Sequence, residues 1–233
     1  MNNKLINLQL LRALAILAVV LFHCTGFDTI NSGIFVKPLQ LGAAGVDLFF
    51  VISGFIIWRT TANNTTSPVS FLSRRYLRIM PMYWIISGSL ILMMLLKGKI
   101  FDLATITTSL LLLPSANYPI LNVGWSLIHE LYFYSIFSLI LIISSPRIRL
   151  TILWVWALLS SSLYFYMFPE NPWLQVVTNP FNIEFTLGAT LAYAMSNIQS
   201  YSYRLWPHCI LATLMTLIYW ISQFGWYFPE SIE

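Results

Sequence analysis

The sequence predicts an all-α fold, a polytopic membrane helix bundle of about seven spans plus one short re-entrant or interfacial segment. Hydrophobic residues make up 58% of the 233 residues and charged residues only 9%, a composition outside the range of soluble domains. Aromatic residues reach 16%, as expected for interfacial belts. Because no internal repeat or separate soluble domain is visible, residues 1–233 are predicted to form one membrane-embedded domain.

A span needs about 20 apolar residues, and this requirement locates the helices in order. The predicted spans cover residues 5–26, 41–58, 79–96, 124–143, 150–168, 181–197 and 206–222. The apolar stretch 103–113 is too short to cross comfortably, so we expect a re-entrant or interfacial segment there. The first run resembles a signal peptide, but Arg12 interrupts it and no clear cleavage site follows His23. We therefore expect a retained first span.

Basic residues orient the chain with its N-terminus in the cytoplasm. In that orientation only Lys37, Lys97 and Lys99 fall outside, against nine basic residues on or toward the inside. Those nine are Lys4, Arg12, Arg59, Arg74, Arg75, Arg78, Arg147, Arg149 and Arg204. The net charge of +4 then reflects cytoplasmic loops, and no nucleic-acid partner is implied. The expected partner is membrane lipid.

Arg12 and His23 lie eleven residues apart within the first apolar run. Eleven steps of 100° complete three turns plus about 20°, so both side chains share one stripe of a helix, about 16 Å apart along its axis. An ionisable residue within a span costs about 2.5–3.5 kcal/mol on insertion scales, which makes it a functional candidate. The pair therefore predicts a polar path along the first helix.

Three carboxylates join His23 in the outer half of the predicted bundle. Asp47, Glu130 and Glu184 each lie a few residues into a span that descends from outside. Arg12 is left without a carboxylate at its depth, which favours a ligand anion or backbone carbonyls as its partner. No metal is implied, because the three histidines are scattered and form no ligand spacing.

Five motifs together resemble the acyltransferase 3 family, integral-membrane acyltransferases that modify bacterial surface glycans. They are Arg12-x10-His23, GVDLFFVISGFII at 45–57, RRYLRIMPMYW at 74–84, GWSLIHELYFY at 124–134 and IEFTLGATLAY at 183–193. Members of that family are usually longer, so the resemblance implies that this chain lacks their C-terminal spans. It also implies a bacterial cytoplasmic (inner) membrane location.

The resemblance implies transfer of an acyl group, usually acetyl, from cytoplasmic acyl-CoA to a hydroxyl of the acceptor. The acceptor would be a glycan such as O-antigen or exopolysaccharide, or a lipid-linked saccharide. Arg75 and Arg78, with Arg12, would bind the donor phosphates, since guanidinium suits bidentate phosphate contacts. Neutral His23 would act as general base. An acyl-histidine relay is the main variant.

The same reading gives roles to the remaining candidates. Glu130 or Asp47 would orient the imidazole, as in a catalytic triad. Trp125, Ser126 and Glu184 are assigned to substrate binding.

Alternatives stay open at this stage. The arginines satisfy the positive-inside rule without a ligand. Asp47 can have a structural role, and His129 is expected in core packing. At the level of the whole chain, the alternatives are a truncated non-catalytic membrane protein and a transporter that uses the same intramembrane polar residues.

Overall fold

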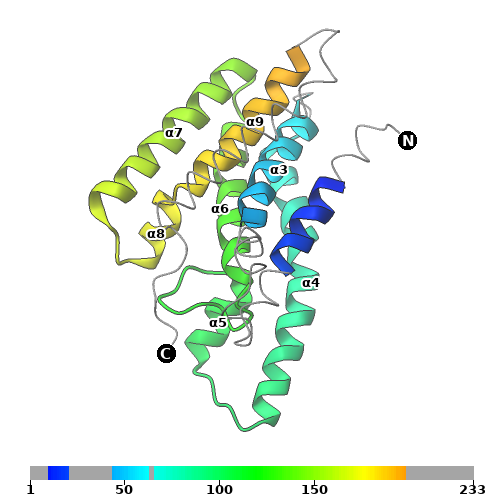
Figure 1. Ribbon diagram of the computed structural model, residues 1–233, viewed down its shortest axis with the longest axis vertical. Coiled ribbons are helices and arrows are strands. Elements are labelled where there is room, and N and C mark those ends of the chain that lie inside the picture. The colour runs from blue at the N-terminus through cyan, green and yellow to red at the C-terminus, as the bar shows by residue number, and fades with distance from the viewer. Residues whose placement is uncertain (1–9, 21–43, 63–65, 198–233) are drawn as a thin grey trace, which may run out of the picture. The chain divides into compact units, whose positions relative to one another are not determined.

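The computed structural model describes residues 10–20, 44–62 and 66–197 (Figure 1). Within these ranges the regular elements are all helices, which confirms the all-α prediction there. The chain divides into two compact units, Met1–Ile52 with Ala194–Glu233, and Ser53–Tyr193. The predicted span 206–222 and His23 lie outside the described residues.

In the first unit, the helix Leu10–Val20 packs against the beginning of α3 (Ala44–Thr61). A Cβ atom added at Gly45 would lie 2.6 Å from the backbone oxygen of Ala15, so the helices approach too closely for a side chain. One turn further along α3, the Phe49 ring lies 5.4 Å from the Arg12 guanidinium carbon. Gly45 contacts Ala15, and Phe49, later in α3, contacts Arg12, earlier in the first helix. The two helices are therefore antiparallel, as expected for consecutive spans.

The second unit is organised around α4 (Pro68–Leu96) and α6 (Gly124–Ile140). The Phe71 ring lies 6.2 Å from the Tyr134 ring, whereas Tyr83 lies beside Gly124, so these helices are antiparallel. Helix α4 begins well before the predicted start at 79. Ser67 caps it by accepting a hydrogen bond from the Ser70 amide, and Pro68 occupies its first turn. Both are regular helix-start signals that a hydropathy criterion ignores.

Helix α5 (Leu103–Leu111) lies along the C-terminal part of α4. The Tyr83 hydroxyl donates to the Ser109 carbonyl at 2.7 Å, and the Trp84 indole donates to the Leu110 carbonyl at 2.8 Å. Helix α5 thus ends beside Tyr83, where α6 begins. Helix α5 therefore runs back along α4, and its re-entrant or interfacial placement in a membrane stays a prediction.

Helices α7 (Pro146–Met167), α8 (Pro172–Thr178) and α9 (Phe181–Asn197) complete the described chain. Helix α8 falls in a stretch predicted as a loop. It is only seven residues long, starts with Pro172 after the Asn171 cap, and therefore gives no span-length hydropathy signal.

Helices α9 and α7 are joined by two polar contacts. The Trp154 indole donates to the Thr190 hydroxyl at 3.0 Å, and the Asn182 amide donates to the Ser160 hydroxyl at 3.2 Å. The order of these contacts makes α7 and α9 antiparallel.

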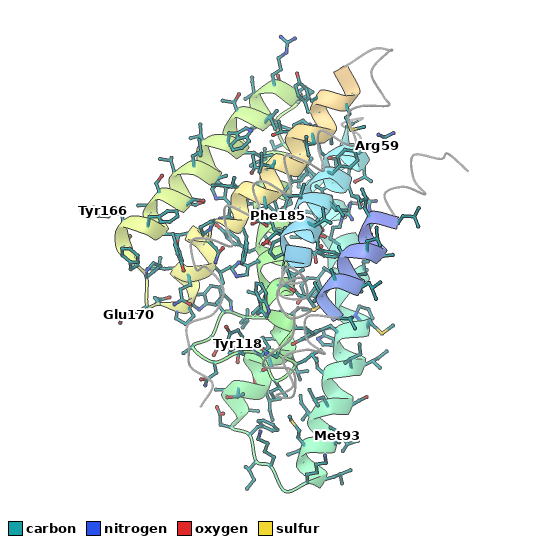
Figure 2. The ribbon with its side chains drawn as sticks, in the orientation of Figure 1. Arg59, Met93, Tyr118, Tyr166, Glu170 and Phe185 are labelled. Atoms are coloured by element: carbon teal, nitrogen blue, oxygen red, sulfur yellow. The ribbon has the colours of Figure 1, made fainter. Side chains whose placement is uncertain are left out.

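Helices α4 and α7 are long and apolar enough to cross a membrane. Both expose large apolar side chains, among them Met93, which Figure 2 labels on the part of α4 that extends past α6. Further exposed examples are Ile85, Leu92, Leu96, Ile152, Val155, Leu159 and Leu163. Such faces suit contact with lipid. The count of seven spans stays a prediction.

Candidate active site

Glu130 on α6 is a buried carboxylate held by two hydroxyl groups. Its side chain is only 5% exposed. The Ser53 hydroxyl of α3 donates to Glu130 Oε1 at 3.1 Å, and the Tyr134 hydroxyl donates to the same oxygen. Glu130 and Tyr134 are four residues apart and therefore share one face of α6. Ser53 and Tyr134 together fix the position of this carboxylate.

Arg75 on α4 approaches the same cluster from the other side of the Tyr134 ring. Its guanidinium carbon lies 5.7 Å from the Tyr134 ring centre and 5.4 Å from that of Phe71. Its Nη2 atom donates to the Thr60 hydroxyl at 3.0 Å. Arg78 follows Arg75 by about one turn of α4. Because Arg75 is half-buried and Arg78 exposed, the pair presents positive charge at the surface of a polar cluster.

Glu130 therefore lies beside the arginine-bearing turns of α4, although its sequence position placed it in the outer half of the bundle, away from those arginines. The physical reason is the level at which α6 begins. Gly124, taken as the outer boundary of a span, lies against Tyr83 in the middle of α4. Helix α5 occupies the remaining length of α4, so a few residues of α6 suffice to reach Arg78 and Arg75.

The three residues predicted to bind substrate occupy neighbouring places on α6 and α9. The Trp125 ring lies 5.7 Å from Phe181, and the Ser126 hydroxyl donates to the Val123 carbonyl at 3.1 Å. Glu184, in the first turn of α9, is 7% exposed.

His129 lies in an aromatic cluster with Trp125 and Phe181. Its ring centre is 6.1 Å from that of Trp125 and 5.3 Å from that of Phe181, and both pairs meet edge to face. Edge-to-face packing is a favourable arrangement for aromatic rings. These contacts fit the packing role expected for His129.

Arg12 and Asp47 both belong to the first unit. The Arg12 guanidinium faces the Phe49 ring, so a cation–π contact now accompanies the predicted ligand or carbonyl partner. Asp47 is buried in the first turn of α3. A carboxylate there stabilises the positive end of the helix dipole, which gives a physical basis to the structural role left open for Asp47.

Sequence reasoning missed the three hydroxyl-bearing residues that surround Glu130 and Arg75. Tyr134 had a detectable signal, because a tyrosine four residues after a glutamate shares its helix face. Ser53 and Thr60 are seven residues apart and share a face of α3. No pattern in the sequence indicates that this face meets both α6 and α4.

The site can hold an anion next to a buried acid. Guanidinium groups bind phosphate and carboxylate oxygens, and aromatic stacking fixes the guanidinium plane before a ligand arrives. Among residues 10–20, 44–62 and 66–197, no group of three His, Cys, Asp or Glu side chains could hold a metal ion.

The sequence matches a family model over nearly its whole length. Residues 5–232 match the acyltransferase domain family, which is the acyltransferase 3 family that the five motifs resemble. A relative, the exopolysaccharide production protein ExoZ of Rhizobium meliloti (strain 1021), is 37% identical over 107 residues, which are 42% of this chain and 34% of that protein. The matched region is thus about a third of the relative's length. No solved structure matches significantly. The chain belongs to the acyltransferase domain family, a membrane-associated family.

Proposed function

We propose that this member of the acyltransferase domain family transfers an acyl group, first of all acetyl, from cytoplasmic acyl-CoA to a hydroxyl group of an extracytoplasmic glycan. The observation that carries the proposal is the position of the Arg75 guanidinium over the ring of Tyr134, whose hydroxyl donates to the buried carboxylate of Glu130. The name of the Rhizobium relative refers to exopolysaccharide production, which supports an exopolysaccharide hydroxyl as the acceptor.

The arginine pair supplies the donor end of the site. Acyl-CoA carries phosphate groups at one end and its thioester at the other, so binding and chemistry occur at separate places. Arg75 and Arg78 bind the phosphates through charge-assisted hydrogen bonds. Arg12, on the first helix, is the third cation assigned to the donor. Binding energy from this remote end holds the thioester in place for reaction.

His23 supplies the base. Its neutral imidazole removes the proton from the glycan hydroxyl, whose oxygen attacks the thioester carbonyl carbon. The new C–O bond forms as the C–S bond breaks, and the departing CoA thiolate accepts a proton. One carboxylate, Asp47 or Glu130, supports the imidazolium. Attack by the imidazole itself, with an acyl-histidine intermediate, is the covalent form of the same reaction.

The membrane arrangement follows from the two substrates. The donor comes from the cytoplasm, and the arginines of α4 lie on the cytoplasmic side when the N-terminus is inside. The acceptor reaches the protein from the opposite side of the bacterial inner membrane. Trp125, Ser126 and Glu184 are assigned to that acceptor.

The decisive experiment measures transfer of radiolabelled acetyl groups from acetyl-CoA to exopolysaccharide fragments by the purified chain in detergent. His23→Ala should lower the transfer rate by about 10²–10⁴-fold, typical of general-base removal, with acetyl-CoA affinity nearly intact. Arg12→Ala should instead weaken acetyl-CoA binding, because it removes a cation assigned to the donor. Near-normal transfer by a correctly folded His23→Ala variant would refute the base assignment. Absence of any acetyl-CoA-dependent labelling or hydrolysis by the wild-type chain would refute the proposed reaction.

A further inference from the structure

Tyr134 contacts both charged parts of the candidate site, the carboxylate of Glu130 and the guanidinium of Arg75. We propose that Tyr134 is a positioning residue that couples these two groups, so that Glu130 serves the donor-binding arginines. The inference rests on the proposed function, since it assigns Glu130 to the acyl-CoA end of that reaction. Thr60 and Ser53 complete the coupling.

The hydroxyl group of Tyr134 fixes the position of the Glu130 carboxylate. Both Tyr134 and Ser53 donate to one oxygen, Glu130 Oε1. Two donors from different helices leave the carboxylate little rotational freedom, and hydrogen bonds to a charged group are the stronger kind. The negative charge is thereby held within one helical turn of the ring that Arg75 faces.

The ring of Tyr134 fixes the position of the Arg75 guanidinium in the donor site. The Arg75 guanidinium lies near the faces of both Tyr134 and Phe71, and its Nη2 donates to Thr60. Two aromatic rings and one hydroxyl thus set the plane of the guanidinium. Because this group has five N–H donors in a rigid fork, the same geometry can hold Thr60 and present the fork to a phosphate.

Electrostatic attraction links the Glu130 carboxylate to the Arg75 guanidinium. Taking an ionised carboxylate out of water is costly unless opposite charge and hydrogen bonds accompany it. The positive charge of Arg75 lies over the ring of Tyr134, whose hydroxyl donates to Glu130. Loss of the tyrosine would therefore disturb the acid and the arginine together, whereas a residue that only filled space would affect neither.

The test uses the full chain in detergent and acetyl-CoA as the probe, with dissociation constants from calorimetry and with KM and kcat from acetyl transfer. Tyr134→Phe keeps the ring but removes the hydroxyl, and Tyr134→Leu removes both. Thr60→Val removes the hydroxyl that accepts from Arg75, with little change in shape. Matched controls are Tyr132→Phe, whose hydroxyl faces the Val177 carbonyl at 3.5 Å, and Thr61→Val, whose hydroxyl bonds to backbone carbonyls.

Coupling predicts a graded loss of donor affinity. The dissociation constant for acetyl-CoA should rise roughly fivefold in Tyr134→Phe and in Thr60→Val, and roughly twentyfold in Tyr134→Leu, from the usual strength of charge-assisted hydrogen bonds and cation–π contacts. The kcat value at saturating acetyl-CoA should stay within about twofold of wild type. Tyr132→Phe and Thr61→Val should keep both values.

Two other results would overturn the coupling. Unchanged acetyl-CoA affinity with a lowered kcat would place Tyr134 and Glu130 at the transfer step. Equal losses in the control variants would make the effect one of general packing. If Tyr134→Leu fails to fold, Tyr134→Phe and Thr60→Val still decide the matter. Failure of the wild-type chain to bind acetyl-CoA would instead refute the donor itself, and the coupling with it.

Discussion

Gly54 and Gly88 both lie inside apolar helices, α3 and α4, but their surroundings differ. A Cβ atom at Gly54 would lie 2.0 Å from the backbone oxygen of Phe185 on α9, whereas a Cβ atom at Gly88 would have no neighbour within 4 Å. Figure 2 labels Phe185 in this packed region. The same residue type thus marks a helix contact in one place and an exposed helix surface in the other.

The difference shows where the polar site can exist. Ser53, next to Gly54, reaches Glu130 because α3 lies close to the helices around it. On the exposed part of α4, beyond Trp84, side chains such as Ile85 and Leu92 are more than half exposed and apolar. Polar and ionised groups need partners when they leave water, so they gather in the packed region, while the exposed surface stays apolar.

The largest expected effect is that of Gly54→Ala. Overpacking usually costs about 1–3 kcal/mol. Here we expect a cost well above that range, because the added Cβ atom would meet backbone at 2.0 Å, and backbone cannot rotate away as a side chain can. We expect a strong loss of monodisperse protein in detergent and of its melting temperature. Gly54→Ala with a wild-type melting temperature would show that α3 and α9 are not in close contact.

Phe185→Ala should come next. The Phe185 and Phe133 rings are stacked with centres 4.2 Å apart, and both side chains are fully buried. Removing a buried phenylalanine ring typically costs about 3–5 kcal/mol because a cavity remains. Phe165→Ala is the matched control, since that ring is 47% exposed and should cost far less. Thermal denaturation of both variants provides the measurement, and equal losses would contradict a packed region centred on Phe185.

Hydropathy predicted helices well where they are long and apolar. The predicted segment 79–96 ends at the same residue as α4, and the predicted segment 181–197 begins at the same residue as α9. The first turns of α4 were missed because they contain Arg74, Arg75 and Arg78, which lower the hydropathy without opposing a helix. Their beginning is set by Ser67 and Pro68, which are local signals, and not by apolar length.

The candidate site was predicted as separate residues but not as an assembly. Arg75 and Arg78 were identified through the resemblance to the acyltransferase 3 family, and Glu130 through that resemblance and through its charge within a predicted span. The meeting of Arg75 and Glu130 at Tyr134 depends on where α6 starts beside α4, and the contacts of Tyr83 with α5 and Gly124 set that position. Such contacts link residues far apart in sequence, and one sequence carries no signal for them. The role of His23 stays a prediction.

A smaller, pH-dependent effect is expected where α5 begins, beside the exposed part of α4. Asp102 caps α5, and hydrogen bonds from the Thr105 hydroxyl and the Thr105 amide hold the pKa of this exposed carboxyl below its ordinary value. A lowered pKa means that the ionised form stabilises the folded helix. This contribution is present above the ordinary pKa and is lost as the pH falls through the lowered value.

Amide hydrogen-exchange protection of residues 105–111 should therefore decrease on acidification to pH 3 in the wild-type chain. In Asp102→Asn, which keeps a capping oxygen but does not titrate, protection should be nearly independent of pH over the same range. The exchange of α6 amides serves as an internal control. Equal pH dependence in both proteins would show that ionisation of Asp102 does not stabilise α5.

Gly88→Ala should have the smallest effect and the opposite sign to Gly54→Ala. An exposed glycine in a helix interior is about 1 kcal/mol less favourable than alanine, and the added methyl group at residue 88 meets no neighbouring atom. A rise in melting temperature of about 2 °C is therefore expected. The comparison with Gly54→Ala is matched, since each variant adds one methyl group to an apolar helix. If Gly88→Ala lowered the melting temperature as Gly54→Ala does, the exposed face of α4 would have to be covered by protein rather than lipid, and the contrast between the two regions would no longer hold.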